Sequence, residues 1–265
     1  PIDSLRENKV MSLKTRFGNL GNILDFDTLT KENIYVLNSP ILSNSQFNKF
    51  INFFGKNSIN IDCTFLQEEN LSNAIKRIQK EAEIAVRQGI TQIILSDKDL
   101  SSQKLPMPML LCVGAINTFL IEKKLRGYVS INVQSGEALD THSFATLIGV
   151  GATTINPYLA FDSLYQRHSK KLFGQFSFDE CIQRYIKSVN AGLLKIMSKM
   201  GISVLSSYRG GCNFETVGLS RTVVDDYFPG VTSKISGIGL VGIEKKIRQI
   251  HKEAFESTET VLPIG

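Results

Sequence analysis

The length, composition and charge of the chain indicate an ordinary folded protein. It has 265 residues, of which 42% are hydrophobic and 21% charged, unlike the composition of disordered chains. The formal net charge is +5, but basic and acidic residues are mixed along the whole chain, so no basic stripe indicates a nucleic-acid partner. The longest apolar stretch, around residues 107–120, is too short and too polar to span a membrane. Neither nucleic acid nor a membrane is therefore an expected partner.

The cysteines and the first residues favour a cytoplasmic location. Cys63, Cys112, Cys181 and Cys212 form no CxxC pair and have no histidine near them, which argues against a zinc site and a disulfide framework. The N-terminus has neither the basic nor the apolar region of a secretory signal. We expect a reducing environment and no metal in this chain.

The first part of the chain, residues 1–45, predicts an irregular arm. Gly18 and Gly21 punctuate it, and only short apolar pieces such as residues 34–37 are typical of strands. Further along, short β-branched runs alternate with long segments of helical period. This alternation predicts an α/β body over residues 46–265, in which repeated βα units form a barrel-like, mostly parallel sheet, complete or incomplete, with surrounding helices.

The predicted units of the body follow one another in chain order. Residues 59–65 alternate as on a half-buried strand, and Asn70 can cap a helix that stops at Gly89. A buried strand over residues 92–96 precedes a core helix that Pro106 opens. The later predicted elements are a strand over residues 128–133, a helix over 141–148, a strand over 153–156, a helix over 178–200 that stops at Gly201, and a strand over 202–205.

Parallel α/β folds bind ligands beyond the carboxyl ends of their strands, so the residues after each strand are the candidate positions for function. They are Asp97 and residues 134–137, 156–158 and 206–211. The Ser135–Gly136 turn is similar to a phosphate-binding loop, but Glu137 would repel a phosphate, so we interpret the turn as structural. Arg209 is the better anion candidate, although we favour an arginine paired with an acidic residue at a domain interface.

Residues of the kinds that carry catalysis do not occur at informative spacings. The histidines, His142, His168 and His251, lie on or beside predicted helices without a cysteine, serine or paired carboxylate near them in sequence. Cys63 and Cys112 are interpreted as small core residues. We assign no catalytic, cofactor-binding or metal-binding residue to this chain.

Short segments spread over nearly the full length carry a family resemblance. They are residues 1–7, 10–13, 39–42, 135–137, 142–145, 147–149, 151–152, 155–161, 192–203, 207–210 and 217–220. Together these segments resemble the central domain of the glutamate synthase large subunit. Three positions depart from the family pattern: Gln134 replaces an acidic residue, Gly211 stands where alanine is frequent, and Lys234 replaces an arginine. The departures leave the resemblance intact but weaken any claim about charge at those positions.

The resemblance implies a non-catalytic connector. In that family an amidotransferase domain releases ammonia from glutamine, and a later FMN domain with an iron–sulfur cluster makes glutamate from 2-oxoglutarate and ammonia. FMN and the iron–sulfur cluster are thus implied for the parent enzyme, and no cofactor for this chain. The implied partners are the amidotransferase and FMN-binding domains of the same chain, and ferredoxin or an NADPH-oxidising small subunit. The implied location is the cytoplasm, or the plastid stroma for a plastid-type parent.

The resemblance also implies that the arm helps wall the route that carries ammonia between the two active sites. Neutral ammonia is preserved where bulk water and proton donors are excluded. The candidate passage or interdomain residues are Met11, Ser12, Ser39, Ser43 and Arg209. Two alternatives stay open: an arm that only packs between domains, and a stand-alone flavin- or phosphate-binding α/β barrel enzyme.

Overall fold

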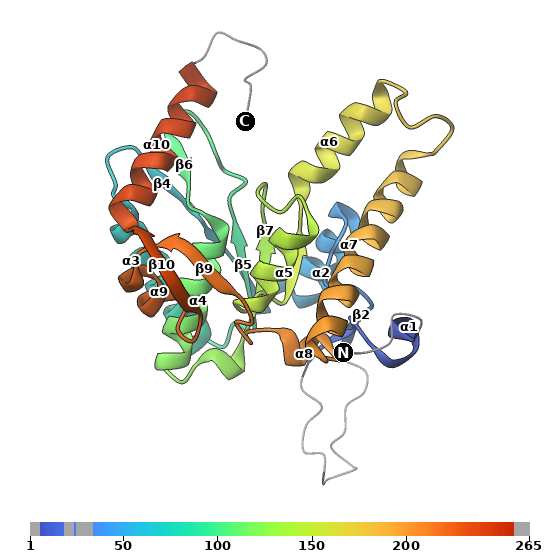
Figure 1. Cartoon of the computed structure of the whole chain (residues 1–265), viewed down its shortest axis with the longest axis horizontal. Helices are drawn as coiled ribbons and strands as arrows, with labels where there is room; N and C mark the ends of the chain where they lie inside the picture. Colours follow the sequence, from blue (N-terminus) through green and yellow to red (C-terminus); the bar gives the residue numbers. More distant parts are fainter. Residues whose placement is uncertain (1–5, 19–23, 25–33, 257–265) are drawn as a thin grey trace.

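A four-stranded parallel sheet organises the computed structural model, which describes residues 6–18, 24 and 34–256 (Figure 1). Its strands lie in the order β3 (Ser58–Asp62), β5 (Gln92–Ser96), β7 (Ser130–Gln134) and β8 (Thr154–Asn156). Each new strand takes the next place in the sheet, and α3 (Leu71–Arg87), α4 (Met109–Glu122) and α5 (Thr141–Gly149) connect them. The predicted fold class is confirmed, and the described strands form an open sheet instead of a closed barrel.

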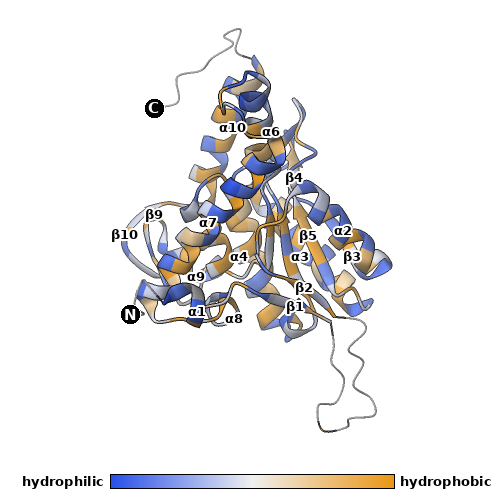
Figure 2. Ribbon diagram, turned by 90° about the vertical axis from the view of Figure 1, so that its right-hand side faces the viewer, coloured by the Kyte–Doolittle hydropathy of each residue, from blue (hydrophilic) through white to orange (hydrophobic). Residues whose placement is uncertain are grey.

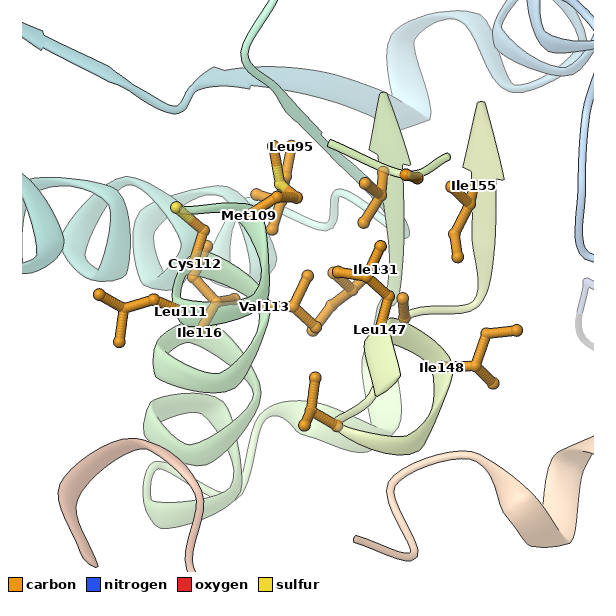
Figure 3. Close-up of a cluster of buried hydrophobic side chains, with 14 of the residues drawn as sticks. Leu95, Met109, Leu111, Cys112, Val113, Ile116, Ile131, Leu147, Ile148 and Ile155 are labelled. Carbon is orange, nitrogen blue, oxygen red and sulfur yellow. The ribbon is translucent and has the colours of Figure 1, made fainter. Parts of the chain in front are cut away.

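The two faces of this sheet belong to different hydrophobic clusters, because successive side chains of a strand point to opposite sides. Leu95, Ile131 and Ile155 lie in the main core with side chains of α4 and α5, as Figure 3 shows. Ile94 belongs to a second, smaller cluster with Phe47 and Phe50 of α2 (Asn44–Phe54). The helices α3, α4 and α5 therefore cover one face, while α2 covers the other. In Figure 2 the strand β5 between them is mostly orange, that is, hydrophobic.

The predicted irregular arm contains three short elements that are tied to the body. These are α1 (Glu7–Val10) and the antiparallel strands β1 (Thr15–Phe17) and β2 (Tyr35–Leu37). Ile41 bridges Ile155 in parallel, so the arm extends the sheet beyond β8. Gly21, where the sequence predicts a break in regular structure, lies outside the described residues.

Three sequence predictions about local structure are wrong. Residues 59–65 are two strands, β3 and β4 (Thr64–Leu66), because β4 leaves the sheet to pair with β6 (Lys104–Pro106). Pro106 ends β6, and the helix α4 begins after Pro108. Residues 202–205 form no strand, because Val204 only bridges Ser12 and a short helix, α8 (Leu205–Tyr208), follows at once.

The remaining helices and strands lie at the two sides of the sheet (Figure 1). The sequence predicts α7 (Phe178–Met200) correctly: Ser177 and Glu180 form a capping box, and Gly201 ends the helix with φ 72°. The other elements, missed in the sequence, are α6 (Tyr158–Ser169), β9 (Glu215–Leu219), α9 (Arg221–Tyr227), β10 (Thr232–Ile238), α10 (Leu240–Glu256) and the 3₁₀ turns η3 (Gly55–Asn57) and η4 (Arg126–Tyr128). In the described segments, no helix combines the length and apolar character needed to cross a bilayer.

We predict that Gly114→Ala destabilises the protein although alanine is the better helix former. A Cβ at Gly114 would collide with the Phe228 ring and lie 2.7 Å from the Tyr227 carbonyl oxygen. Overpacking of this kind costs roughly 1–3 kcal/mol of unfolding free energy, measurable by urea denaturation. Gly127→Ala is the matched control, because its Cβ would meet nothing within 4 Å. Equal stability of the two variants would contradict the close contact between α4 and the end of α9.

Candidate functional site

The carboxyl ends of β5 and β7 bring a buried carboxylate to the edge where ligands of such folds bind. Asp97 follows β5 and is 3% exposed. Its carboxylate accepts the Ser135 hydroxyl at 2.7 Å and the Gly136 N–H at 3.1 Å. The Tyr158 hydroxyl at the start of α6 also interacts with it. The sequence predicted these positions singly, and the structure brings them together.

The electrostatics of this cluster are those of a satisfied structural group. Burial raises the pKa of Asp97, and the hydrogen bonds from Ser135 and Gly136 oppose that rise. Burial and the neighbouring Asp97 carboxylate raise the pKa of Tyr158. The Ser135 hydroxyl donates to Asp97 and accepts the Glu137 N–H at 3.0 Å. Both functions of this hydroxyl are therefore occupied within the cluster.

The same contacts decide what the Ser135–Gly136 turn can hold. A phosphate cradle needs free backbone N–H groups and local positive potential. Here the N–H of Gly136 bonds Asp97 and that of Glu137 bonds the Ser135 hydroxyl. The Asp97 carboxylate thus takes the position that an anion would need. This geometry supports the interpretation of the turn as structural.

A row of polar side chains crosses the sheet at its carboxyl edge and ends on the arm. Ser96 donates to Gln134, and the Gln134 amide donates to the Asn156 oxygen at 3.2 Å. The Asn156 amide in turn donates to the Leu42 carbonyl at 3.0 Å and to the Asn44 side chain at 2.9 Å. The sequence shows polar residues at the ends of the strands, but this row depends on the strand register, which the residues alone do not specify.

The five candidate passage residues lie at three separate places. Met11 is buried in the main core, and Ser12 pairs with the segment before α8, where its N–H donates to the Ser203 carbonyl at 2.8 Å. Arg209 follows α8 and donates to the Thr15 hydroxyl at 3.1 Å. Ser39 and Ser43, in contrast, lie farther along the arm, beside α7 and at the start of α2. The structure therefore groups Met11, Ser12 and Arg209, and separates them from Ser39 and Ser43.

Ser39 and Ser43 use their side chains to hold the arm. The Ser39 hydroxyl donates to the Asn190 oxygen of α7 at 2.8 Å and accepts the Ile41 N–H. Ser43 caps α2 in a capping box with Gln46. Ser43 also lines a hollow of about 370 Å³ between the start of α2 and the helices α6 and α7. The other residues that line it are Asn44, Ser45, Phe161, Asp162, Tyr165, Phe178, Asp179, Ile182 and Gln183.

Arg209 is a partly buried cation without an acidic partner in the described part of the chain. Burial lowers its pKa, and its Nε is buried without a hydrogen-bond partner. Burial and the charge of Arg209 lower the pKa of Arg126 to about 10. Arg126 itself donates to three neutral oxygens, of Asn117, Val129 and Gly151. The acidic partner expected for Arg209 across a domain interface stays a prediction.

The histidines and cysteines have structural surroundings. His168 and His251 contact the carbonyl oxygens of Phe176 and Ser101 through Nε2, and His142 is exposed. Cys63 and Cys112 are fully buried, and burial raises the pKa of Cys112, which keeps its thiol neutral. Among the described residues, no three His, Cys, Asp or Glu side chains cluster in a way that could hold a metal ion.

Sequence comparison relates the chain to known proteins. The family model for the glutamate synthase central domain matches residues 1–220. The chain is 49% identical over its full length to the glutamate synthase (NADPH) large chain of Azospirillum brasilense and covers 18% of it. Over 97% of its length it is 42% identical to the large chain of Bacillus subtilis (strain 168), and it covers 17% of that protein. The ferredoxin-dependent glutamate synthase of Pyropia yezoensis is 40% identical over 98% of this chain, which covers 18% of it. The chain thus spans less than a fifth of the length of these relatives.

We predict that Asp97 makes the protein less stable as pH rises. Its folded pKa lies above 3.8, so the stability that its protonated form contributes is present below 3.8 and is lost as pH rises through the folded value. The difference in unfolding free energy between the wild type and Asp97→Asn should therefore fall across this window in urea titrations. Asp140→Asn is the control with the opposite sign, because hydrogen bonds from Ser143 lower the pKa of Asp140. A difference for Asp97→Asn that rises with pH would contradict the buried cluster.

Proposed function

The chain belongs to the glutamate synthase central domain family, and on that basis we propose that it is the connector between the glutamine-hydrolysing and glutamate-forming sites of that enzyme. The parent enzyme converts glutamine and 2-oxoglutarate into two molecules of glutamate with a reductant. We assign this chain no chemical step of its own. The proposed location is the cytoplasm, or the plastid stroma if the parent is of the plastid type.

The cofactors of the parent enzyme do not fit the residues of this chain. A flavin phosphate at the Ser135–Gly136 turn would meet the carboxylate of Asp97, whose oxygens already hold the backbone N–H of the turn. An iron–sulfur cluster needs several thiolates together. Within the described ranges, no such group of ligands occurs, and burial keeps the Cys112 thiol protonated. We therefore propose that FMN and the cluster bind to other parts of the polypeptide.

The observation that carries the connector proposal is the anchoring of the arm. Ser39 forms a hydrogen bond with Asn190 of α7, which is 151 residues away in the sequence. Asn156 forms one with Leu42, which is 114 residues away. Ser12 is paired with the segment before α8. These long-range contacts hold the arm at fixed places on the α/β body. A backbone fixed in this way can form the wall of a narrow passage. A loose linker between domains would not need such contacts.

The hollow beside Ser43 is the proposed part of the ammonia passage in this chain. Phe161 and Ile182 give it apolar walls, while Ser43 and Asn44 provide neutral polar groups. Asp162 and Asp179 are the acidic side chains of its lining. The oxygens of these side chains can accept hydrogen bonds from an ammonia molecule in the hollow. In the intact enzyme, neighbouring domains would close the hollow against bulk water.

We predict that Ser39→Phe in the intact enzyme lowers glutamine-dependent glutamate synthesis but not ammonia-dependent synthesis. The aromatic ring would displace the arm from Asn190 and disturb the wall beside α2. Ser39→Ala is the matched control: it removes the two hydrogen bonds at a cost of about 1 kcal/mol in stability but adds no bulk. The ratio of the two activities, measured for each variant, separates the effects. A parallel loss of both activities in Ser39→Phe would refute a role of this segment in ammonia transfer.

We predict further that the chain alone does not bind FMN. Flavin fluorescence during titration with the purified chain should remain that of free FMN. The Asp97→Asn variant is tested in the same way. It removes the charge that would repel the flavin phosphate at the turn but opens no new site, so we expect no binding by this variant either. Saturable binding at micromolar FMN would support the alternative of a stand-alone flavin-binding barrel.

A further inference from the structure

A nearly continuous apolar groove runs along α10, away from the arm and the Ser43 hollow. Its larger part is a hollow of about 350 Å³ between α4, α9, β10 and α10. A second hollow of about 170 Å³ continues it toward the end of α10. Both parts share Ile247, Ile250 and Glu137. Apart from Glu137 and Lys246, the larger hollow is lined by apolar residues.

Several large apolar side chains in the lining of this groove remain exposed to solvent. They are Leu100 at 42%, Ile238 at 46%, Ile250 at 55% and Phe255 at 46%. They come from β10, α10 and the loop before β6. The exposed side chains therefore border one groove and are not scattered singly over the surface.

The strands β9 and β10 give an independent reason to expect a cover. Among the strands that the structure describes, they pair only with each other, and the pairing is parallel. Parallel sheets are normally covered on both faces, and an isolated pair of strands is marginally stable. Here Val217 and Ile235 are register partners, and both remain exposed. This pair of strands has the character of a sheet that another segment completes.

Glu137, an exposed residue, provides one polar acceptor in the lining of the groove. Its Oε2 accepts the Met109 N–H at 2.8 Å, and its other oxygen has no partner among the described residues. Surrounding protein atoms and the nearby Asp97 carboxylate raise the pKa of Glu137, although the residue keeps contact with solvent through the groove. A bound segment with a hydrogen-bond donor at this point would give the second oxygen of the Glu137 carboxylate a partner.

We propose that this groove binds a polypeptide segment of the full-length large chain that lies outside these 265 residues. The segment would place apolar side chains along α10 and a lysine, arginine or backbone N–H at Glu137. The relatives support this occupant, because this chain spans only 17–18% of their length and leaves most of each polypeptide to supply it. Attachment to the same chain also raises the effective concentration of such a segment. The inference needs family membership but not the ammonia passage.

The test compares amide hydrogen exchange of residues 240–256 in the full-length enzyme and in the 265-residue chain. We expect exchange to be roughly tenfold slower or more in the full-length enzyme, because the bound segment covers α10. Ile250→Glu in the full-length enzyme should return exchange to the level of the shorter chain. Ile121→Glu is the matched control and should leave it slow, because Ile121 is equally exposed, at 55%, and lies near the end of α4, outside the lining of both hollows.

Two outcomes would overturn the proposal. Equal exchange of residues 240–256 in both proteins would mean that no outside segment covers α10. Protection of the shorter chain that grows with its concentration would assign the groove to a second copy of the chain. Glu137→Gln in the full-length enzyme is the second variant, since it keeps the shape of the side chain and removes its charge. Glutamine still accepts a hydrogen bond, so faster exchange in this variant than in Ile121→Glu supports a lysine or arginine at Glu137, and unchanged exchange contradicts a charged partner and leaves the backbone N–H as the donor.

Discussion

The hydrogen bonds of the Asn156 side chain are the contact on which the arrangement of the chain depends. Asn156 lies at the end of β8. Its side-chain oxygen accepts a hydrogen bond from the Gln134 amide, and its side-chain amide donates to the Leu42 carbonyl and the Asn44 side chain. It is fully buried, so loss of either partner would leave a polar group without water, at a cost of about 1–3 kcal/mol. This one side chain joins the sheet, the arm and the start of α2. The positions of Ser39 and Ser43 on the body follow from that junction.

The edge of the sheet where ligands usually bind is closed in this chain by its own residues. Asp97 accepts hydrogen bonds from the Ser135 hydroxyl and the Gly136 N–H. The side chains of Ser96, Gln134 and Asn156 are hydrogen-bonded to one another along the same edge. Under the proposed connector function, an α/β architecture typical of enzymes serves as a scaffold without a change in topology. A carboxylate at the right place is sufficient, because it satisfies the backbone donors and repels phosphate at the same time. In that case the functional residues would lie on the surfaces that face other parts of the polypeptide and not at the strand ends.

The sequence predicts well what depends on neighbouring residues. Alternating βα segments, the Asn70 cap, and the Gly201 stop of α7 are local signals, and the structure confirms them. The predictions fail where a distant partner decides the outcome. Val204 looks like a strand residue but meets only Ser12 of the arm, and Pro106 pairs with β4 before α4 begins. For the same reason the contact of Asp97 with Ser135 and Tyr158 was outside the reach of sequence patterns. The candidate passage residues came from family resemblance, and the structure adds that Ser39 and Ser43 are anchoring groups.

The winding of the sheet in one direction has a consequence for biosynthesis. Each βα unit from β3 to β8 packs on the unit made just before it, so these units can assemble while the chain is still being translated. The arm precedes the sheet in the sequence but completes its pairing only after β8 is made, because Pro40 and Leu42 exchange hydrogen bonds with Ile155. Phe47 and Phe50 cluster with Ile94 and can be covered once β5 is made. Ile41 is buried beside Ile155 in the complete fold, so its side chain stays uncovered while the sheet is translated, and a chaperone would bind there.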